Sequence, residues 1–584
     1  MSVAEQTTIP ALLARHASER PDAVALRSKR RGLWQATSYA ELQRRVAALS
    51  AGLRAAGVTP GATVALIAEN SPSWVVTDLA VQALGARSVA LAPQTPPATV
   101  VRVLAASGAT LVVCGDQEQV DVVLDAEGAL PAVAAIVVID ATGTTHYSEA
   151  RLHTLAELEA QGADGSAALD APRPETVAVG VCSPGTTGDP RIAPHGGGDL
   201  AELAASAAAW LELTPKDRNL AVLSLATPAA RLLDLYAMLQ AGAEVTLPES
   251  PATVAVDLLE VEPTVLCLSP RGVELLRQAS QRRAGESSRM KRRVYRWAMG
   301  QLDTRLDRQP AARTPDGARR RRGPAYLLVG RFVAAALGVR RARRIVVTGG
   351  ALPLRDARFF WSLGVPVLES YGHAETGGLA FAHRSLDDMG TIGGPLPGVG
   401  TRIEDDGTLA VATVAAPGRW HATGDLAEDA GDERVRVRGR REDVVATAGG
   451  EVVVAGLEAA LRDSVYVRRA VVAHAGGALT ALVELDLDET APWANDRGLV
   501  FSTYSSLASL PEVRELVAAE VAAANERIGA AERIADFRLL PRPLSVAEGE
   551  LTSLLTVRRT QVIERFAGDE AATAGAEATA PSRP

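Results

Sequence analysis

Short apolar runs, each long enough for one buried strand, recur along this 584-residue chain. They alternate with segments of helical spacing, such as 74–84 after the run 64–68. Runs rich in Val, Ile and Leu without polar alternation are typical of parallel strands covered on both faces, and repeated alternation with helices indicates an α/β architecture. Six further runs fit the pattern, namely 110–114, 135–139, 177–181, 220–225, 264–268 and 344–348.

The length of the chain predicts two or three domains. After Gly390 the pattern changes to short strands and turns, and from Gly456 to mixed helix and strand; residues 568–584, rich in Ala, Glu, Thr and Pro, are predicted to be a disordered tail. No apolar run reaches the roughly 18 residues of a transmembrane segment, and residues 1–21 lack the pattern of a signal peptide. We therefore expect a soluble, cytoplasmic protein.

Charge and cysteine content exclude several classes of function. The net charge of −8 argues against a general nucleic-acid binder. Cys114, Cys182 and Cys267 are far apart and have no neighbouring histidine pairs. This spacing indicates neither a zinc site nor a disulfide framework.

Residues 282–344 form a basic segment in an acidic protein, with 19 Lys or Arg against four acidic residues. Such a segment fits three partners: an acidic carrier protein, a phosphate of CoA, or an anionic membrane surface touched peripherally. The alternative is a solvated helical lobe with no partner.

Residues 177–195 contain an apolar run that ends in small and hydroxyl residues. Such a loop leaves backbone N–H groups and hydroxyls free to face one anion, which predicts a polyphosphate site, and Arg191 adds a positive charge nearby. It differs from a P-loop because no lysine follows the last glycine at the required place. The alternative is a strand followed by a polar turn. The predicted phosphate-binding residues are Ser183, Gly185, Thr186, Thr187, Gly188 and Arg191.

Four later stretches follow in order, at 344–353, 367–377, 420–426 and 437–452. Together with the loop at 177–195 they resemble the motifs of the adenylate-forming superfamily, which includes acyl-CoA synthetases, peptide-synthetase adenylation domains and luciferases. The resemblance is strongest to long-chain fatty acyl-CoA synthetases and extends from about Ile9 to Phe566. It implies a large N-terminal AMP-binding region (1–440) of two parallel-sheet α/β subdomains and a small β subdomain. A small mobile α+β domain (441–567) follows.

The resemblance also implies roles for single residues and the cofactors ATP or AMP, Mg²⁺ and CoA. Asp425 matches the carboxylate that holds the ribose hydroxyls, and Glu375 the ligand of the ATP-bound Mg²⁺. Arg440 is expected to contact ribose or phosphate, next to the family hinge at Glu442. The remaining residues implied to bind nucleotide are Tyr371, which offers a flat face to adenine, and Gly349, Gly350, Ala351, Glu369, Ser370 and Gly372.

Several positions depart from the family pattern. Pro184 removes a donor from the phosphate loop, Ala374 replaces a threonine, and residues 227–228 replace an aromatic or histidine gate. By the same resemblance Thr556 stands at the adenylation lysine, and no lysine follows Lys291. Arg440, Arg191, Glu375 and Thr556 are therefore the predicted catalytic positions of a diverged site.

The predicted function is that of a ligase-like, ATP-dependent enzyme that activates a small-molecule acid as its AMP derivative, in a biosynthetic pathway. The acceptor would be CoA, an amine or the thiol of an acyl carrier protein. Two alternatives remain open. One is an ATP-dependent diazotase that activates nitrite, and the other is a pseudoenzyme that keeps nucleotide or acyl binding and acts as a partner protein.

Overall fold

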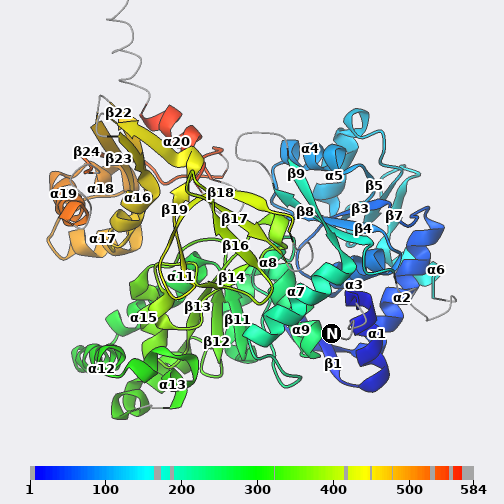
Figure 1. Ribbon diagram of the computed structural model, residues 1–584, viewed down its shortest axis with the longest axis horizontal. Helices are drawn as coiled ribbons and strands as arrows, with labels where there is room; N and C mark the ends of the chain where they lie inside the picture. Colours follow the sequence, from blue (N-terminus) through cyan, green and yellow to red (C-terminus); the bar gives the residue numbers. More distant parts are fainter. Residues whose placement is uncertain are drawn as a thin grey trace, which may run out of the picture. The chain divides into compact units, whose positions relative to one another are not determined.

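The computed structural model describes residues 7–163, 172–183, 190–320, 323–413, 418–447, 450–475, 478–526, 533–546, 548–551 and 557–567 (Figure 1). The chain forms two compact units. The first comprises Met1–Thr401, Val411–His421 and Ala430–Val435, and the second Arg402–Ala410, Ala422–Asp429 and Arg436–Pro584. The predicted tail 568–584 lies outside the described residues, and the division of the chain at Arg440 stays a prediction.

The largest sheet of the first unit has seven strands in the order β7-β6-β5-β3-β4-β8-β9. All neighbours are parallel except β8 and β9, which form an antiparallel hairpin. Val64 and Leu66 belong to one core, and Ala65 and Ile67 to another, as expected of a strand covered on both faces. The strands are β3 Thr63–Ile67, β4 Arg87–Leu91, β5 Ala109–Cys114, β6 Ala135–Val138, β7 Leu152–Thr154, β8 Val177–Ser183 and β9 Arg191–Gly196.

Helices pack on both faces of this sheet (Figure 1). One core contains α1 Ile9–Glu19, α2 Tyr39–Ala55, α3 Pro72–Ala83, α6 Leu155–Gln161, α7 Gly197–Trp210 and α9 Ala237–Ala241, and the other contains α4 Pro97–Ser107 and α5 Gln117–Asp125. Local sequence fixes where several helices begin. Ser71 Oγ accepts a hydrogen bond from Trp74 N (3.1 Å), and Pro72 occupies the first position of α3, where its missing N–H is not needed.

A second sheet of the first unit has five strands in the order β11-β12-β13-β14-β15. β11 Val265–Leu268, β12 Arg344–Val347 and β13 Val367–Tyr371 are parallel, whereas β14 Phe381–Ala382 and β15 Gly394–Pro395 are antiparallel. The chain leaves β12 and β13 at the same edge of the sheet. Its own core contains α10 Val254–Val261, α11 Pro270–Gly285, α12 Arg289–Arg308 and α15 Leu354–Ser362. A three-stranded sheet is formed by β10 Val245–Leu247, β1 Val24–Arg30 and β2 Leu33–Ser38.

The predicted strand at 220–225 is wrong, because this run is not a strand in the structure. The side chain of Asn70 takes up its backbone groups. Asn70 Nδ2 donates to the carbonyls of Ala221 (2.9 Å) and Leu223 (2.8 Å), and its Oδ1 accepts from Leu225 N (2.9 Å). A buried backbone needs partners for these groups, and here a side-chain amide supplies three of them, while Ala221 N donates to the carbonyl of Thr246 in β10 (2.8 Å).

The basic segment is largely helical where the structure describes it, up to Ala336. Its elements are α12, η4 Pro310–Arg313, α13 Pro315–Arg320, the π-helical η5 Tyr326–Gly330 and α14 Arg331–Ala336. Among the described residues, no helix is long and apolar enough to cross a membrane.

A four-stranded sheet has the strand order β16-β17-β18-β19. The second unit contains a three-stranded sheet, β22-β23-β24, with a core shared by α16 and α19. The predicted fold class is therefore confirmed: parallel α/β sheets are followed by a small β region and a small α+β region. The strands are β16 Gly400–Ile403, β17 Thr408–Ala412, β18 His421–Asp429, β19 Val435–Arg440, β20 Val444–Thr447, β21 Gly450–Val453, β22 Val467–Ala475, β23 Ala478–Leu485 and β24 Asp536–Leu539, and the helices are α16 Val454–Arg462, α17 Leu487–Asn495, α18 Tyr504–Ala508, α19 Pro511–Glu526 and α20 Arg559–Phe566.

Candidate functional site

The glycine turn 349–351 follows β12 at the edge where β13 ends in Tyr371. Gly349 has φ +84°, a backbone conformation that favours glycine, and no heavy atom lies within 4 Å of the position a Cβ would occupy. Open α/β sheets bind ligands beyond the carboxyl ends of their parallel strands. Gly349 therefore leaves open space at this edge of the sheet, and the predicted contact of the turn with adenine stays a prediction.

Glu369 joins this turn to β13. Its buried carboxylate accepts a hydrogen bond from Leu352 N (2.9 Å). Burial raises the pKa of Glu369 to about 7, although this hydrogen bond acts in the opposite direction. Ser370, also buried, donates from Oγ to the carbonyl of Val347 (3.2 Å). Both side chains are thus bonded within the protein, and their predicted contact with nucleotide stays a prediction.

Neighbouring aromatic rings fix the orientation of the Tyr371 ring. Its hydroxyl lies 2.7 Å from His373 Nε2. The rings of His373 and Phe381 meet it edge to face, at centroid distances of 5.0 and 5.8 Å. A ring held on two sides is preorganised to stack on a base, because little rotational freedom is lost on binding.

The turn that carries Glu375 is closed by tight glycine contacts. A Cβ on Gly372 would lie 2.4 Å from the carbonyl carbon of Gly378 and from Leu379 N. A Cβ on Gly378 would lie 2.5 Å from Ala229 N, and Gly378 has φ +92°. Only glycine fits at either position. The turn is therefore fixed on β13 at one end and against the Pro228 helix α8 (Pro228–Ala230) at the other.

The structure brings this turn together with the hairpin predicted to bind phosphate. His195 Nε2, near the end of β9, donates to the carbonyl of Ala374 at 2.7 Å. His195 is only 6% exposed. Burial lowers its pKa, while the Ala374 carbonyl and the charges of Asp199 and Glu375 act in the opposite direction. A neutral ring that donates from Nε2 thus joins two segments 179 positions apart in sequence.

The phosphate role of the hairpin stays a prediction. Ser183 and Arg191 are paired at its loop end, and the Arg191 side chain is exposed. A Cβ on Gly180 would lie 2.8 Å from Ile192 Cγ2 and 2.9 Å from Val89 Cγ2, so the strands approach closely behind it. The predicted residues Gly185, Thr186, Thr187 and Gly188, with Pro184, lie outside the described residues.

Glu375 fits the role of a single carboxylate ligand. It is half-buried in the 3₁₀ turn η6 Ala374–Thr376, and no hydrogen bond or ion pair to its carboxylate is found among the described residues. The described part of the chain contains no group of three or more His, Cys, Asp or Glu that could enclose a metal. Mg²⁺ commonly takes one or two protein carboxylates and completes its shell with water and substrate phosphates. The residues present therefore fit Mg²⁺ delivered with ATP.

Asp425 and Arg440, predicted separately from two motifs, lie together in the second unit. Arg440 Nε is 3.3 Å from Asp425 Oδ1, and the Asp425 side chain is buried whereas that of Arg440 is half-exposed. Thr423 Oγ1 accepts from Asp425 N (3.1 Å) and donates to the carbonyl of Leu409 (2.8 Å). Arg440 thus places a positive charge beside a carboxylate whose oxygens can accept hydrogen bonds from hydroxyl groups.

A buried polar cluster was not predicted from the sequence. It joins Asp78 and Gln82 of α3 to Arg231 and Tyr236 of a π-helical turn, η2 Arg231–Tyr236. Charged residues are rarely buried unless paired. The sequence feature that could have indicated this cluster is Asp78, an aspartate within the apolar segment predicted as a helix at 74–84.

The basic segment exposes apolar as well as charged side chains. Met290, Val294 and Trp297 lie on one face of α12, and Met290 and Trp297 are 78% and 50% exposed. Lys291 and several exposed arginines stand between them in sequence. We call this surface the α12 face.

Comparison with known proteins decides the family. Residues 13–425 match the family described as AMP-binding enzyme. The chain belongs to this family. A long-chain-fatty-acid–CoA ligase of Mycobacterium bovis, FadD15, is 29% identical to this AMP-binding enzyme over 600 residues, covering 97% of each chain. The human long-chain-fatty-acid–CoA ligase ACSBG1 is 22% identical over 605 residues, covering 94% of this chain and 82% of its own.

Solved structures of adenylate-forming enzymes share the fold of this AMP-binding enzyme. The anthranilate CoA ligase AuaEII, in complex with anthranoyl-AMP, has a TM-score of 0.72 at 18% identity, covering 98% of this chain and 99% of its own. A carboxylic acid reductase didomain from Segniliparus rugosus, in complex with AMP, has a TM-score of 0.72 at 20% identity. The match covers 99% of this chain and 83% of the didomain. The resemblance inferred from the motifs is therefore confirmed, and the chain is a ligase-class, adenylate-forming enzyme by family.

Proposed function

We propose that this AMP-binding enzyme uses ATP to convert an acid to its adenylate and passes the activated group to CoA, an amine or a carrier thiol. The observation that carries the proposal is the hydrogen bond from His195 to the carbonyl of Ala374. It holds the hairpin predicted to bind phosphate against the turn that presents Glu375. An enzyme that transfers a nucleotidyl group needs these two parts at a fixed separation.

The described residues divide the work of binding. Tyr371 and the turn 349–351 would hold adenine, and Asp425, beside Arg440, would accept hydrogen bonds from the ribose hydroxyls. Mg²⁺ held by Glu375 would supply positive charge to the phosphates. Arg191 and Ser183, at the loop end of the hairpin, would bind the same phosphates together with residues 185–188.

Loss of the adenylation lysine limits the first step. The family resemblance puts Thr556 at this position, which lies outside the described residues. Arg559, three residues further on, is committed elsewhere: Nε donates to Asp443 Oδ1 (2.8 Å), Nη2 to Glu458 Oε2 (2.7 Å) and Nη1 to the carbonyl of Val472 (2.9 Å). Removing one group that stabilises developing charge commonly costs about 10² to 10³ in rate. We expect ordinary carboxylates to be activated slowly.

For the α12 face we propose an anionic membrane surface as the partner. A helix that exposes Met290, Val294 and Trp297 between cationic residues is suited to the lipid interface, where apolar side chains enter the acyl boundary and cations meet headgroups. An acidic carrier protein would use the cations but leave these apolar side chains in water.

Pyrophosphate release with ATP and Mg²⁺ tests the proposed reaction. Glu375→Gln and Asp425→Ala should each lower kcat/KM for ATP by about tenfold or more, whereas Asp405→Ala, which removes an exposed carboxylate, should not. Calorimetry on the wild type should show binding of AMP or ATP. If nucleotide binds but no acid yields pyrophosphate, the chain is a partner protein without catalysis; if no nucleotide binds, the proposal is wrong.

A further inference from the structure

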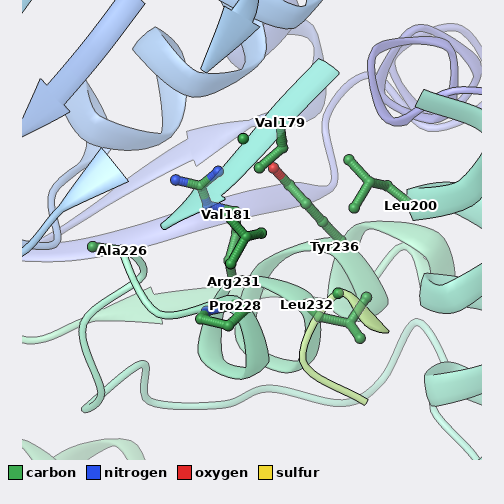
Figure 2. A pocket seen from close by; sticks show the side chains of 10 residues that line it. Val179, Val181, Leu200, Ala226, Pro228, Arg231, Leu232 and Tyr236 are labelled. Atoms are coloured by element: carbon green, nitrogen blue, oxygen red, sulfur yellow. The ribbon is translucent and has the colours of Figure 1, made fainter. Parts of the chain in front are cut away.

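A small cavity lies beside the hairpin predicted to bind phosphate (Figure 2). Its volume is about 10 Å³, which is room for about one water molecule. Val179, Gly180 and Val181 of β8 form one wall, and Gly377, two residues after Glu375, also lines it. An acid that is to be joined to a phosphate must lie next to the phosphate-binding groups, and this cavity is so placed.

The cavity contains a buried cation with unused donors. Arg231 is 4% exposed. Its Nε donates to the carbonyl of Leu225 (3.1 Å), and its guanidinium lies 4.9 Å from the centre of the Trp74 ring. No hydrogen bond from either Nη atom is found among the described residues. Because Arg231 lines the cavity, these donors can serve a bound group.

The π-helical turn brings two polar side chains to the cavity. A π turn has hydrogen bonds between residues five apart, so Arg231 and Tyr236, its first and last residues, lie above one another. Figure 2 shows both side chains extending from this turn toward the strand that carries Val179 and Val181. An α-helical turn would rotate one of the two away.

Asp78, the counter-ion of Arg231, already accepts hydrogen bonds from two neutral side chains. Asp78 Oδ2 accepts from the Tyr236 hydroxyl (2.7 Å) and from Gln82 Nε2 (3.0 Å). Asp78 Oδ1 is 3.6 Å from Arg231 Nη1, beyond hydrogen-bond distance. Burial raises the pKa of Asp234, on the same turn, to about 8, so this residue adds little negative charge at neutral pH. The guanidinium is thus partly neutralised, and its remaining donors are unpaired.

We infer that this cavity binds a small planar oxyanion through Arg231, and that this oxyanion is the acid which the enzyme activates. The inference rests on the proposed function and names its substrate class. Two oxygens on one atom match the paired N–H groups of a guanidinium. Nitrite and the one- or two-carbon carboxylates share this geometry and have only a few heavy atoms.

The same cavity disfavours a long acyl chain. Methylene groups would lie against a guanidinium whose Nη donors gain no hydrogen bond from them, and buried donors without acceptors are unfavourable. A chain of many carbons would also need a volume far larger than the space for one water molecule. A small oxyanion places few atoms in the cavity, and its oxygens would accept hydrogen bonds from the Nη donors of Arg231.

Arg231 would also supply a positive charge in place of the missing adenylation lysine. In the reaction, one oxygen of the oxyanion forms a bond to the α-phosphorus of ATP while the bond to the bridging oxygen breaks, and pyrophosphate leaves with that electron pair. Two negative groups must approach each other for this to occur. A guanidinium on the oxyanion lowers their repulsion, which is the task of the lysine that Thr556 replaces.

The experiment measures pyrophosphate release by the full chain with ATP, Mg²⁺ and one acid at a time: nitrite, formate, acetate, octanoate or palmitate. We expect release with one or more of the three small anions and none with octanoate or palmitate. Arg231→Met should raise KM for the active anion by about tenfold or more. Arg231→Lys, which keeps the charge but not the paired donors, should raise it less.

Two controls separate this inference from the proposed function. Arg87→Met removes a half-buried arginine of β4 that bonds Thr63 of β3 and the carbonyl of Ser107 at the end of α4, and KM for the anion should not change. AMP affinity should be equal in all variants. Faster release with octanoate or palmitate, or an unchanged KM in folded Arg231→Met or Arg231→Lys, would overturn the inference alone. ATP binding without release for any acid would overturn the proposed function as well.

Discussion

Replacing His195 with phenylalanine should weaken the binding of Mg²⁺–ATP by about fivefold. The ring shape is kept, but the 2.7 Å hydrogen bond to the carbonyl of Ala374 is lost. A buried group left without a partner costs about 1–3 kcal/mol. The Ala374 carbonyl also accepts from Gly377 N at 3.2 Å, so it keeps one partner. The loss should therefore be close to that of one ordinary hydrogen bond, about 1 kcal/mol, or about fivefold in an equilibrium constant.

Calorimetry with Mg²⁺–ATP measures this change, and His146→Phe, at an exposed position, is the control. Affinity within twofold of the wild type in a folded His195→Phe protein would refute the view that His195 holds the hairpin against the Glu375 turn. The pH dependence gives a second check. Burial lowers the pKa of His195 in the folded state, so the unfolded state binds more protons. Stability should fall as pH drops below about 6.5, and the phenylalanine variant should lose this component.

Three further predictions concern other parts of the molecule. Burial raises the pKa of Glu369 to about 7, so its contribution to the free energy of unfolding should fall by up to about 3 kcal/mol as pH rises from 4.5 to 7. In Glu369→Gln, the melting temperature should depend less on pH over this range. Identical pH profiles of the variant and the wild type would contradict the assignment. Arg559→Met should destabilise the second unit by about 3 kcal/mol, because it leaves Glu458 buried without its cation; hydrogen exchange of β22 should then accelerate, and unchanged exchange would argue against this role. Met290→Asp combined with Trp297→Asp should reduce flotation with phosphatidylglycerol vesicles severalfold, and salt should reduce it in the wild type; if the double variant floats equally well, the α12 face does not bind membranes.

Much of the fold could be predicted because its signals are local. Apolar runs such as 110–114 and 264–268 became β5 and β11, since strands covered on both faces need continuous apolar sequence. The run 220–225 has the same composition and is not a strand. The difference comes from Asn70, about 150 positions away, whose side chain bonds its backbone. Composition carries no information about such a remote partner.

The candidate site was predictable only in part, for a related reason. Motifs identified Glu375 and the hairpin separately, but their connection through His195 depends on the packing of β9 against η6. The cavity was missed because its lining residues are spread over β8, α7, α8, η2 and the turn at Gly377. Arg231 reads from the sequence as one more arginine in an arginine-rich chain, and only its burial beside Asp78 gives it a role.

The π-helical turn has a consequence for how such sites diverge. A π turn contains one residue more than an α turn of the same length, so deleting a single residue between Arg231 and Tyr236 would restore regular helix. The two side chains would then be four positions apart and would stay on one face of that helix. Conversion to regular helix without a deletion would instead leave them five positions apart, about 140° from each other around the axis. Between relatives, the length of this segment is therefore informative together with the residues at its two ends.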